Sequence, residues 1–448
     1  MEEKMDYRAI AEQVIKICKQ KGADQAEAYL ASGRELSLEV RNGKIESIQE
    51  ASSYGLGLRV ISGHKLGFAY VNDFRPESLE ETVRRALDFA RILTADENNV
   101  LPDDPAMTEV RGLYDPGLSQ IPLDRKIALA REVESLALKV KGITRSEGAR
   151  YGESESEIVL ANSLGLVKSY KSSGCGFGVG AIAEKGEQKS SGYESCQRRF
   201  FADLKPPAEV AKRAADLALE MLDPRPVKTQ RAAVILDPDV AFAILGGIIQ
   251  AINGERVLQG ASFLGKKLGQ KIASELITII DDGTLEKGLA SAPFDGEGVP
   301  TQKRPVVENG ILKGFLYNTY AARRAGVKST GNASRGGFDS LPGIGPHNFY
   351  IAAGKMKPEE IIAATDRGVL VKEVTGYGIN PVNGNFSGGA AGLWIENGKI
   401  AFPVKGITIA GTAEEMLNGI DMLGNDLDLN RSRTAPTLRI KSLQIGGE

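Results

Sequence analysis

The chain has 448 residues and a nearly balanced charge, with 56 Lys and Arg against 58 Asp and Glu. Its composition is that of a soluble globular protein with enough residues for two or three domains. Because the net charge is only −2 and no four basic residues follow one another, direct binding to nucleic acid is not expected.

The N-terminal segment has an amphipathic pattern of acids, bases and apolar residues that ends at Gly22. This pattern predicts a helix rather than a signal peptide. The most apolar stretch, from Val240 to Ile252, is too short for a membrane span, which needs about 20 residues. We therefore expect no membrane association.

The three cysteines, Cys18, Cys175 and Cys196, make an odd count without a CxxC pair. A disulfide framework or a cysteine metal cage has no support from this pattern, and we interpret these residues as buried, inert thiols. Together with the N-terminal pattern, this cysteine usage predicts a reducing, cytoplasmic location.

The residues from Glu35 to Val71 have the pattern of a β-meander. A strand, a turn at Asn42 and Gly43, a second strand and the runs YGLGLRVI and KLGFAYV predict four antiparallel strands, and a helix is expected from Pro76 onward.

Much of this pattern recurs 120 residues later, where four matched pairs are Val40 with Leu160, Asn42 with Asn162, Ser52 with Ser172 and Ser53 with Ser173. We interpret the recurrence as a helix, four-strand meander, helix unit used twice. The alternative is that two unrelated meanders look alike by chance.

Two segments rich in Pro, Asp and Gly, residues 96–122 and 223–226, indicate boundaries. We predict an N-terminal α+β domain and a C-terminal β-rich domain of curved, glycine-rich antiparallel sheets, so the fold class is α+β. The predicted domains are residues 1–225, with possible duplicated units 1–95 and 122–223, and residues 226–448.

In the C-terminal half, Asp237 and Pro238 have the pattern of a helix N-terminus, and the helix is expected to end at Ile252. Asn309 and Gly310 predict a hairpin turn. Further predicted elements are strands at 232–236 and 276–280 and helices at 319–325 and 358–366.

The helix that begins at Pro238 carries apolar residues at the spacing of one buried stripe. The predicted stripe is Phe242, Leu245, Ile248, Ile249 and Ile252. The two glycines that follow Leu245 are unusual in a helix interior and are expected to leave room for a neighbouring backbone.

The stretch 383–412 is rich in glycine and contains Asn397 and Gly398, a pair that favours a tight hairpin. Glycine inside a strand pattern is tolerated where another backbone comes close. We therefore predict a sheet whose edge binds an extended peptide, with Ser387, Gly388 and Gly389 as the residues that the peptide approaches.

A second glycine pattern, at residues 174, 176, 178 and 180, has a strict spacing of two. A dinucleotide-binding loop needs a different spacing between a strand and a helix. These glycines are therefore expected to line one face of a strand.

Two histidines and four carboxylates are the remaining candidates for chemistry. His64 is expected in a solvated turn, whereas His347 is the more plausible cleft residue, although no paired carboxylate motif lies nearby in the sequence. The carboxylates are interpreted as solvated turn residues rather than as calcium ligands or acid/base groups; they are Asp281, Asp282, Asp295 and Glu297. No serine lies in a G-x-S-x-G motif.

Five segments together resemble one known family. In chain order they read KGLASAPFDGEGVPT, VVENGILKGFLYNTYAARRAG, STGNASRGG, GGAAGLWIENGKIAFPVKGITIAGT and GNDL. On these motifs the chain resembles the TldD/PmbA family, formerly called modulators of DNA gyrase, and in detail its PmbA branch, also called TldE. The resemblance runs from about Gly246 to Leu443 and is looser over the N-terminal half.

This resemblance implies a metal-dependent peptidase made of a TldD and a TldE subunit, which cuts flexible peptides. TldD members carry HExxxH on a helix, with two imidazoles to hold zinc and a carboxylate to act as base. In this chain the motif falls on Leu245 to Gln250, and Leu245, Gly246 and Gln250 occupy its three functional positions. A third family ligand, a cysteine after GNDL, is absent because no cysteine follows Cys196.

The resemblance therefore implies a subunit without catalytic or metal-ligating residues, which pairs with a zinc-bearing TldD-like partner, or with itself in isolation, and binds an extended peptide. A second hypothesis is a stand-alone hydrolase with an unrecognised active site, for which His347 is the candidate residue. A third, direct action on gyrase or DNA, rests only on the old family name, and the charge balance argues against DNA contact.

Overall fold

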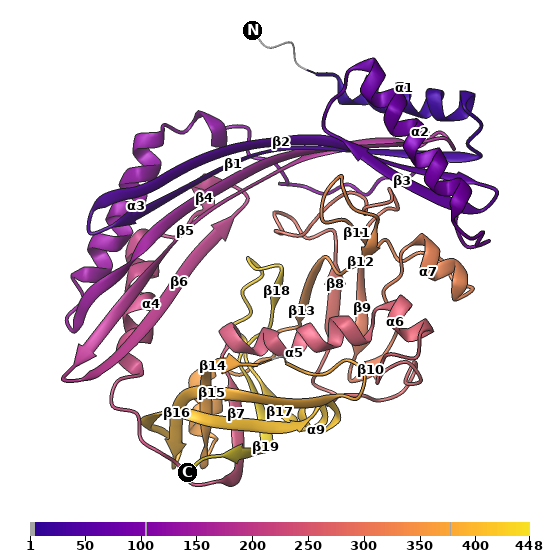
Figure 1. The fold of residues 1–448 in the computed structure, drawn as a ribbon. Helices are drawn as coiled ribbons and strands as arrows, with labels where there is room; N and C mark the ends of the chain where they lie inside the picture. The colour runs from indigo at the N-terminus through magenta and orange to yellow at the C-terminus, as the bar shows by residue number, and fades with distance from the viewer. Residues whose placement is uncertain (1–4, 104, 377) are drawn as a thin grey trace.

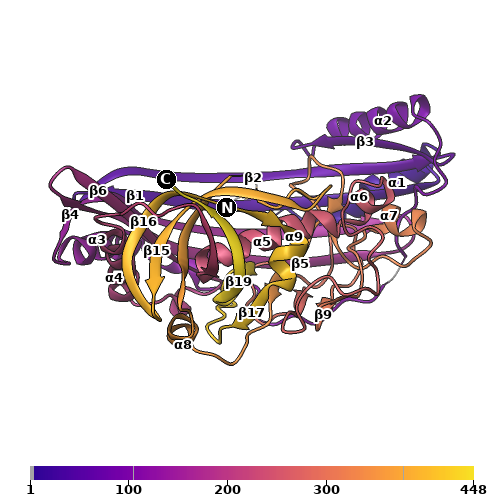
Figure 2. The same ribbon diagram turned by 90° about the horizontal axis from the view of Figure 1, so that it is seen from below.

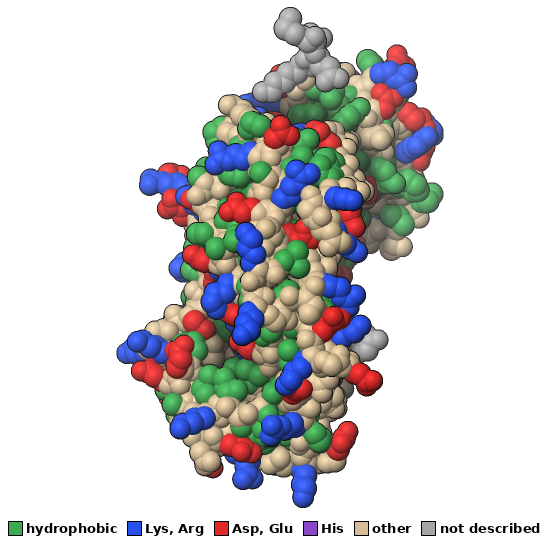
Figure 3. Space-filling view, turned by 90° about the vertical axis from the view of Figure 1, so that its left-hand side faces the viewer, with side chains coloured by type: hydrophobic (Ala, Val, Ile, Leu, Met, Phe, Trp, Pro, Cys, Tyr) green, Lys and Arg blue, Asp and Glu red, His purple; other side chains and the backbone are tan. Residues whose placement is uncertain are grey.

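The structure, a computed structural model, describes residues 5–103, 105–376 and 378–448. A long curved sheet from the N-terminal half arches over a smaller β-rich body from the C-terminal half (Figure 1). Helices and strands are mixed along the chain, which confirms the predicted α+β class. On the face shown in Figure 3, basic and acidic side chains are interspersed.

Within the described residues, the N-terminal half forms one sheet with the strand order β3-β2-β1-β4-β5-β6. β1 and β4 pair antiparallel at its centre, and helices cover its outer face near both ends (Figures 1 and 2). The strands are β1 (Gln25–Arg41), β2 (Lys44–Ser62), β3 (Lys65–Val71), β4 (Ile143–Asn162), β5 (Val167–Lys185) and β6 (Gln188–Arg198). The helices are α1 (Tyr7–Gln20), α2 (Pro76–Ile92), α3 (Leu123–Leu138) and α4 (Pro207–Glu220), with short 3-10 turns η1 (Leu118–Gln120) and η2 (Phe201–Asp203).

Each meander has three strands in the described part of the chain, so the prediction of four strands was wrong. The second predicted strand was expected to end before the run YGLGLRVI. Ser52 and Ser53, which precede that run, instead continue β2. They lie opposite Arg34 and Gly33 of β1, which supplies an unbroken ladder of backbone partners. Small polar residues that would favour a turn in an isolated chain are thus held in an extended strand by pairing with a distant segment.

The C-terminal half contains a curled sheet with the order β16-β15-β14-β7-β19-β17, which closes into a ring because β16 also pairs with β19. Its strands are β7 (Gln230–Leu236), β14 (Arg367–Thr375), β15 (Asn385–Glu396), β16 (Lys399–Thr412), β17 (Ile420–Leu423) and β19 (Leu438–Gly446). A second sheet has the order β10-β9-β8-β13-β18 and contains β8 (Ile279–Asp282), β9 (Lys303–Glu308), β10 (Ile311–Leu312), β13 (Asn348–Ile351) and β18 (Arg433–Thr434). A small pair consists of β11 (Ala333–Ser334) and β12 (Gly343–Ile344).

These sheets are not wholly antiparallel as predicted, because β14 runs parallel to β7 and β18 runs parallel to β13. The parallel partners are far apart in the sequence, so no local turn signal announces them. The two predicted hairpin turns are confirmed: Asn309 and Asn397 have positive φ, and each is followed by glycine. The remaining helices are α5 (Pro238–Ala251), α6 (Gly254–Leu258), α7 (Thr319–Arg324), α8 (Pro358–Ala363) and α9 (Ala413–Asn418).

Helix α5 lies between the ring and the long sheet (Figure 1). It begins at the predicted cap, Asp237, whose side chain accepts a hydrogen bond from the backbone N–H of Asp239. Its predicted stripe is buried except for Phe242, which is 40% exposed. Gly247 fits the prediction of a close approach, because a Cβ there would lie 2.8 Å from the carbonyl oxygen of Ile379. Gly246 faces open space instead.

At the β3 end of the long sheet, buried ion pairs join the two halves of the chain. Arg59 donates to Glu27 of the same sheet at 2.7 Å and to Glu297 of the C-terminal half at 2.7 Å, and Arg335 also pairs with Glu27. Nearby, a Cβ at Gly57 would collide with the carbonyl oxygen of Phe338. This end of the sheet is therefore fastened to the C-terminal half by buried charges, although a cavity of about 810 Å³ that Arg59 and Glu297 also line lies beside them.

Candidate functional site

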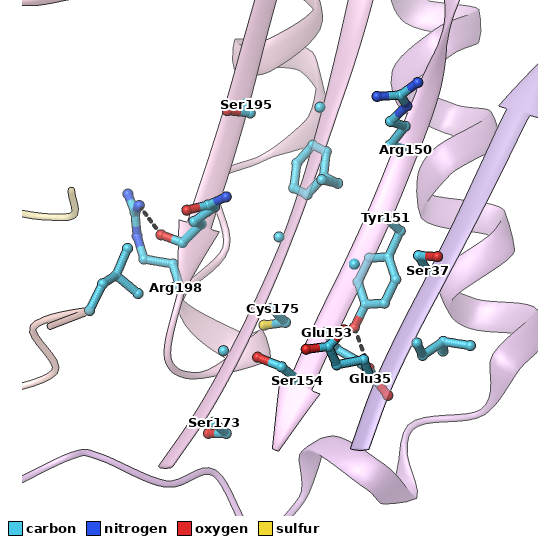
Figure 4. A pocket seen from close by; sticks show the side chains of 18 of the residues that line it. Glu35, Ser37, Arg150, Tyr151, Glu153, Ser154, Ser173, Cys175, Ser195 and Arg198 are labelled. Carbon is cyan, nitrogen blue, oxygen red and sulfur yellow. Dashed lines mark hydrogen bonds between the residues drawn. The ribbon is translucent and has the colours of Figure 1, made fainter. Parts of the chain in front are cut away.

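A cavity of about 700 Å³ lies between the long sheet, near β6, and loops of the C-terminal half (Figure 4). Its floor is made of small residues in register across three strands, with Ser37 opposite Gly152 and Gly152 opposite Gly176. Leu289 and Ser432 contribute to it from the C-terminal half. The glycines of β5 thus line one face of a strand, as their spacing predicted, and that face is the floor of the cavity.

The neighbouring residues of these strands point to the opposite face and pack against α3 and α4. Among them Glu153 is buried, and its carboxylate accepts from the Lys126 ammonium at 2.7 Å and the Tyr151 hydroxyl at 2.7 Å. Burial, followed by the hydrogen bond to Glu153, raises the pKa of Tyr151. This network anchors the floor of the cavity from behind.

Arg199, at the end of β6, holds one wall of the cavity in place. Its guanidinium donates to the carbonyl oxygens of Gly288 at 3.0 and 3.1 Å, Leu289 at 2.7 Å and Ser291 at 3.3 Å, and on the other side to that of Ser173 at 3.0 Å. Because Arg199 is only 8% exposed, this fork of hydrogen bonds is a buried connection between the sheet and the C-terminal loop.

A second cavity of about 600 Å³ adjoins the first, and both are lined by Tyr193, Ser195, Gln197 and Arg198 of β6. Its far wall includes Asp239, in the first turn of α5, and the loop 428–431. Arg431 of that loop pairs with Asp239 at 2.7 Å. We call the two cavities together the β6 cleft.

β6 is the edge strand of the long sheet and, within the described residues, pairs with β5 alone. Its other edge presents alternate backbone N–H and C=O groups without strand partners. Tyr193, on this strand, is 56% exposed. The cleft therefore offers a strand edge, a floor of small residues and an exposed aromatic ring, which together suit an extended peptide.

The residues at the family's metal positions do not fit a metal ion. Leu245 is fully buried in the core, Gly246 has no side chain and Gln250 is an exposed carboxamide. Among the described residues, no group of three or more His, Cys, Asp and Glu side chains is arranged to hold a metal. A hydrocarbon and a bare backbone position supply no lone pair, and a neutral amide is a poor zinc ligand.

His347 lies at the start of β13, where its backbone N–H donates to Asp281 at 2.7 Å. Its Nδ1 atom is 3.8 Å from the Asp281 carboxylate, and its side chain is 11% exposed. Burial alone would raise the pKa of Asp281, but hydrogen bonds from His347 and Asn332 outweigh it and lower that pKa. A histidine and a carboxylate therefore meet here, although they are distant in sequence.

The prediction that the four carboxylates lie in solvated turns was wrong, because all four are buried. Asp295 accepts from the backbone N–H groups of Glu297, Val299 and Ala333 at 2.8 to 2.9 Å. Burial, with the neighbouring charge of Glu297, raises the pKa of Asp295.

The other carboxylates are also occupied by the protein itself. Glu297 accepts from Arg59 and from the backbone of Thr319, while Asp282 accepts from Thr284 and pairs with Lys303 at 3.3 Å. Of these partners, Arg59, Thr319 and Lys303 come from other segments, which local turn patterns do not indicate. These groups hold loops together.

The remaining sequence candidates are structural. His64 is an exposed turn residue with a φ of 60°, as predicted. All three cysteines are free and buried, which confirms their interpretation as inert thiols. Burial raises the pKa of Cys18 and of Cys175 to about 12, so neither is a reactive thiolate near neutral pH.

The glycine-rich strand β15 lies between β14 and β16 rather than at the edge of its sheet, and the approach of a peptide to Ser387, Gly388 and Gly389 stays a prediction. Ser387 and Gly388 in β15 pair with Ala410 and Ile409 of β16, and Gly389 has strand partners on both sides. A Cβ at Gly388 would lie 2.9 Å from the carbonyl oxygen of Thr375. The backbone that these glycines admit is that of β14 in the same chain.

Sequence reasoning missed Arg198, Arg199 and the Glu153 network. Two successive arginines at the end of a strand match no functional motif. The loop that Arg199 contacts lies about 90 residues further along the chain, so the sequence near Arg199 does not indicate the contact. The available signal was the glycine spacing of β5, which indicates a strand face left open by side chains. That pattern identified the floor of the cleft but not its walls.

The fold is that of a metallopeptidase-like protein of the TldD/TldE type. Family models match three stretches: PmbA/TldA metallopeptidase domain 1 at residues 26–90, the central domain at 116–222 and the C-terminal domain at 229–447. The chain belongs to the PmbA/TldD family.

Individual relatives match over nearly the whole chain. It is 32% identical to the metalloprotease PmbA of Escherichia coli, covering 95% of this chain and 93% of the relative. It is 27% identical to a metalloprotease TldD homolog of Buchnera aphidicola, with the same coverage of 95% and 93%.

A solved structure shows the same fold. The crystal structure of TldE from Thermococcus kodakarensis superposes with a TM-score of 0.89 at 27% identity, covering 98% of this chain and all of that one. Within the described residues, no helix is both long and apolar enough to cross a membrane.

Proposed function

We propose that this chain is the non-catalytic, TldE-like subunit of a two-subunit metallopeptidase and that it binds flexible peptides for a zinc-bearing, TldD-like partner. The observation that carries the proposal is the character of α5 at the family's metal positions. Leu245 belongs to the hydrophobic core, and Gly246 and Gln250 provide neither a ligand nor a base.

The scaffold around this helix is retained while the metal ligands are not. The loop after Asp426, where the family's third ligand would stand, carries Arg431 paired with Asp239. A cation at this point opposes the binding of a second cation. The helix and the loop therefore serve packing and charge pairing in this chain, and hydrolysis requires metal ligands from another polypeptide.

The role in substrate binding is supported by the β6 cleft. It has the free edge of β6, along which an extended peptide could form main-chain hydrogen bonds. A peptide bound in this way would be recognised mostly through its backbone, because the floor at Gly152 and Gly176 has no side chains. Such a site accepts many sequences but only unfolded ones.

The experiment compares three samples: this chain alone, an HExxxH-bearing homologue from the same cell alone, and their mixture. Each sample is tested for zinc content and for cleavage of an unstructured peptide. We expect zinc in the homologue, co-elution of the two chains on gel filtration, and cleavage that needs both chains. Equal cleavage by the homologue without this chain would contradict the proposal.

The alternative, a stand-alone hydrolase, has one observation in its favour, the proximity of His347 and Asp281. Within the described residues, the side-chain partners of His347 are Asp281 and Asn332, with no serine or cysteine nucleophile among them. Turnover by the isolated chain that survives a chelator and is lost in His347→Ala would favour this alternative. We expect no turnover by the isolated chain and unchanged activity of the mixture with His347→Ala.

A further inference from the structure

We infer that the β6 side of the cleft is a binding site for a carboxylate group of the bound peptide, formed by Arg198 and Arg199. This inference rests on the proposed function, since it assigns one end of the peptide site. It concerns the charge of the cavity rather than its shape. The carboxylate is either the C-terminus of the peptide or an acidic side chain.

The first observation is that Arg199 is a buried cation without an anionic partner. Its hydrogen-bond acceptors are backbone carbonyl oxygens, and no carboxylate lies within salt-bridge distance of it among the described residues. Carbonyl groups satisfy its N–H donors but leave its positive charge uncompensated. Burial lowers the pKa of Arg199, which is the expected cost of holding this charge away from water.

The hydrogen bonds of Arg199 also leave it one donor. Its Nη1 atom carries two hydrogens, and in the described structure the acceptor of Nη1 is the carbonyl oxygen of Ser173 at 3.0 Å. One N–H of a cavity-lining guanidinium thus remains for a ligand oxygen.

The second observation is the neighbouring Arg198, which lines both cavities and is half-buried. Its Nη1 donates to the carbonyl oxygen of Gln197 at 2.7 Å, and it forms no salt bridge with any described carboxylate. It does help to lower the pKa of Asp428, but the salt-bridge partner of Asp428 is Lys205. Two consecutive residues, Arg198 and Arg199, thus line the first cavity, and neither has a described carboxylate as a salt-bridge partner.

The other charged residues that line the first cavity do not cancel this charge. Arg150 is paired with Glu39 at 2.7 Å, and Glu153 is paired with Lys126 at 2.7 Å. Glu35 has no salt bridge in the described structure, but it comes from β1 and lies on the opposite side of the cavity from Arg198 (Figure 4). Within the first cavity, the β6 side is thus positive and the β1 side negative.

A guanidinium pair of this kind suits a carboxylate, because planar N–H groups match its two oxygens. Arg198 is the last residue of β6, and Arg199 follows it. A peptide paired along the edge of β6 therefore passes these two residues at the end of the strand, where its carboxylate can reach them. A carboxylate held there would set the direction in which the peptide lies.

The test uses a flexible ten-residue Gly/Ser/Ala peptide with an uncharged coumarin at its N-terminus, in three forms. One has a free C-terminal carboxylate, one a C-terminal amide, and one an amide together with a glutamate next to the last residue. Binding to the isolated chain is measured by fluorescence anisotropy. We expect the free acid to bind about tenfold more tightly than the plain amide, as for the loss of one charge-assisted hydrogen bond.

Arg198→Gln is the variant to compare, since Arg198 is only half-buried and its replacement leaves no described carboxylate without a salt-bridge partner. It should bring the affinities for acid and amide to within about twofold of each other. Arg150→Gln is the matched control, because Arg150 lines the same cavity but is already paired, and it should retain the full preference. The glutamate-containing amide identifies the source of the carboxylate: binding as tight as the free acid assigns an acidic side chain, and binding as weak as the amide assigns the C-terminus.

Equal affinity of wild-type protein for all three peptides would overturn the carboxylate site while leaving peptide binding intact. A preference that persists in Arg198→Gln and disappears in Arg150→Gln would overturn its position. If none of the peptides binds, the proposed role in peptide binding fails, and the carboxylate site falls with it.

Discussion

The two ends of the long sheet are built from similar meanders but meet the C-terminal half in different ways. At the β3 end, Arg59 and Glu297 form a buried ion pair across the contact, and Phe338 packs against glycines of β2. At the β6 end, Arg199 reaches carbonyl oxygens only, and a cleft remains open beside it. A cavity lies beside each contact, so the two ends differ in charge: the β3 end is fastened by a neutralised guanidinium, and the β6 end by one that is held by neutral groups.

This difference shows how one structural unit can serve two purposes. A buried charge that is neutralised by carboxylates stabilises a contact but cannot attract a ligand, whereas a buried charge held by neutral carbonyl groups can do both. The two ends should therefore respond differently to the removal of their arginines.

The largest effect is expected from Arg59→Ala. Removing this guanidinium leaves Glu27 with Arg335 as its remaining partner and Glu297 without a cation, both fully buried. Breaking a buried pair in this way costs about 3–5 kcal/mol. The free energy of unfolding, measured by urea denaturation, should fall by this amount.

Arg84→Ala is the control for this measurement, since Arg84 forms similar ion pairs on the exposed surface of α2. Its removal should leave the unfolding curve almost unchanged. If the two variants lost equal stability, the buried pairs would not be what fastens the β3 end.

The next effect is expected from Gly57→Ala. The added methyl group would collide with the backbone of the Phe338 loop, and such overpacking costs about 1–3 kcal/mol. Gly33→Ala, in the partner strand β1, is the control, because its Cβ would lie 3.5 Å from the nearest atom. Limited proteolysis should show faster cutting of the loop 336–341 in the first variant only, and equal cutting in both would count against a closed contact here.

A smaller effect is expected from Arg199→Ala. The substitution leaves no described carboxylate without a cation, and water from the neighbouring cavity can reach the carbonyl groups that Arg199 no longer contacts. The free energy of unfolding should therefore fall by about 1–2 kcal/mol. Urea denaturation of Arg199→Ala and Arg59→Ala under the same conditions checks which variant loses more stability. A loss as large as that of Arg59→Ala would contradict the distinction between the two ends.

The smallest effect concerns pH. Burial, followed by the charge of Glu153, raises the pKa of Cys175 from 9.0 to about 12. The unfolded chain therefore loses this proton near pH 9, while the folded chain keeps it until about pH 12. The stabilisation is complete below pH 9 and is lost as the pH rises toward 12. The fall in unfolding free energy between pH 8 and pH 10.5 should be smaller in Cys175→Ala than in the wild type. The same pH dependence of unfolding free energy in both proteins would contradict the raised pKa of Cys175.

Much of the fold could be predicted because its signals are local. The turns at Asn309 and Asn397 follow from the tolerance of Asn and Gly for positive φ, and the start of α5 follows from Asp237 and Pro238. The exposure of Phe242 could not be predicted, since helical spacing defines a stripe but not how wide a stripe the neighbouring sheets cover.

The site was harder to predict because its contacts are not local. Glu27 and Arg335 are 308 residues apart and yet form a buried pair. The carboxylates of Asp281 and Asp295 lie in sequences typical of solvated turns, and only the distant segments that donate to them explain their burial. The family motifs predicted that α5 occupies the place of the family's metal-binding helix. The charged walls of the β6 cleft depend on contacts between distant segments, which no motif indicates.

We propose that this chain does not hold the metal of a metallopeptidase. The direct test is to incubate the pure chain with excess zinc, remove unbound metal by gel filtration and measure zinc per chain together with cleavage of an unstructured peptide. We predict zinc far below one per chain and no cleavage. One zinc per chain, with cleavage that a chelator abolishes, would contradict the account.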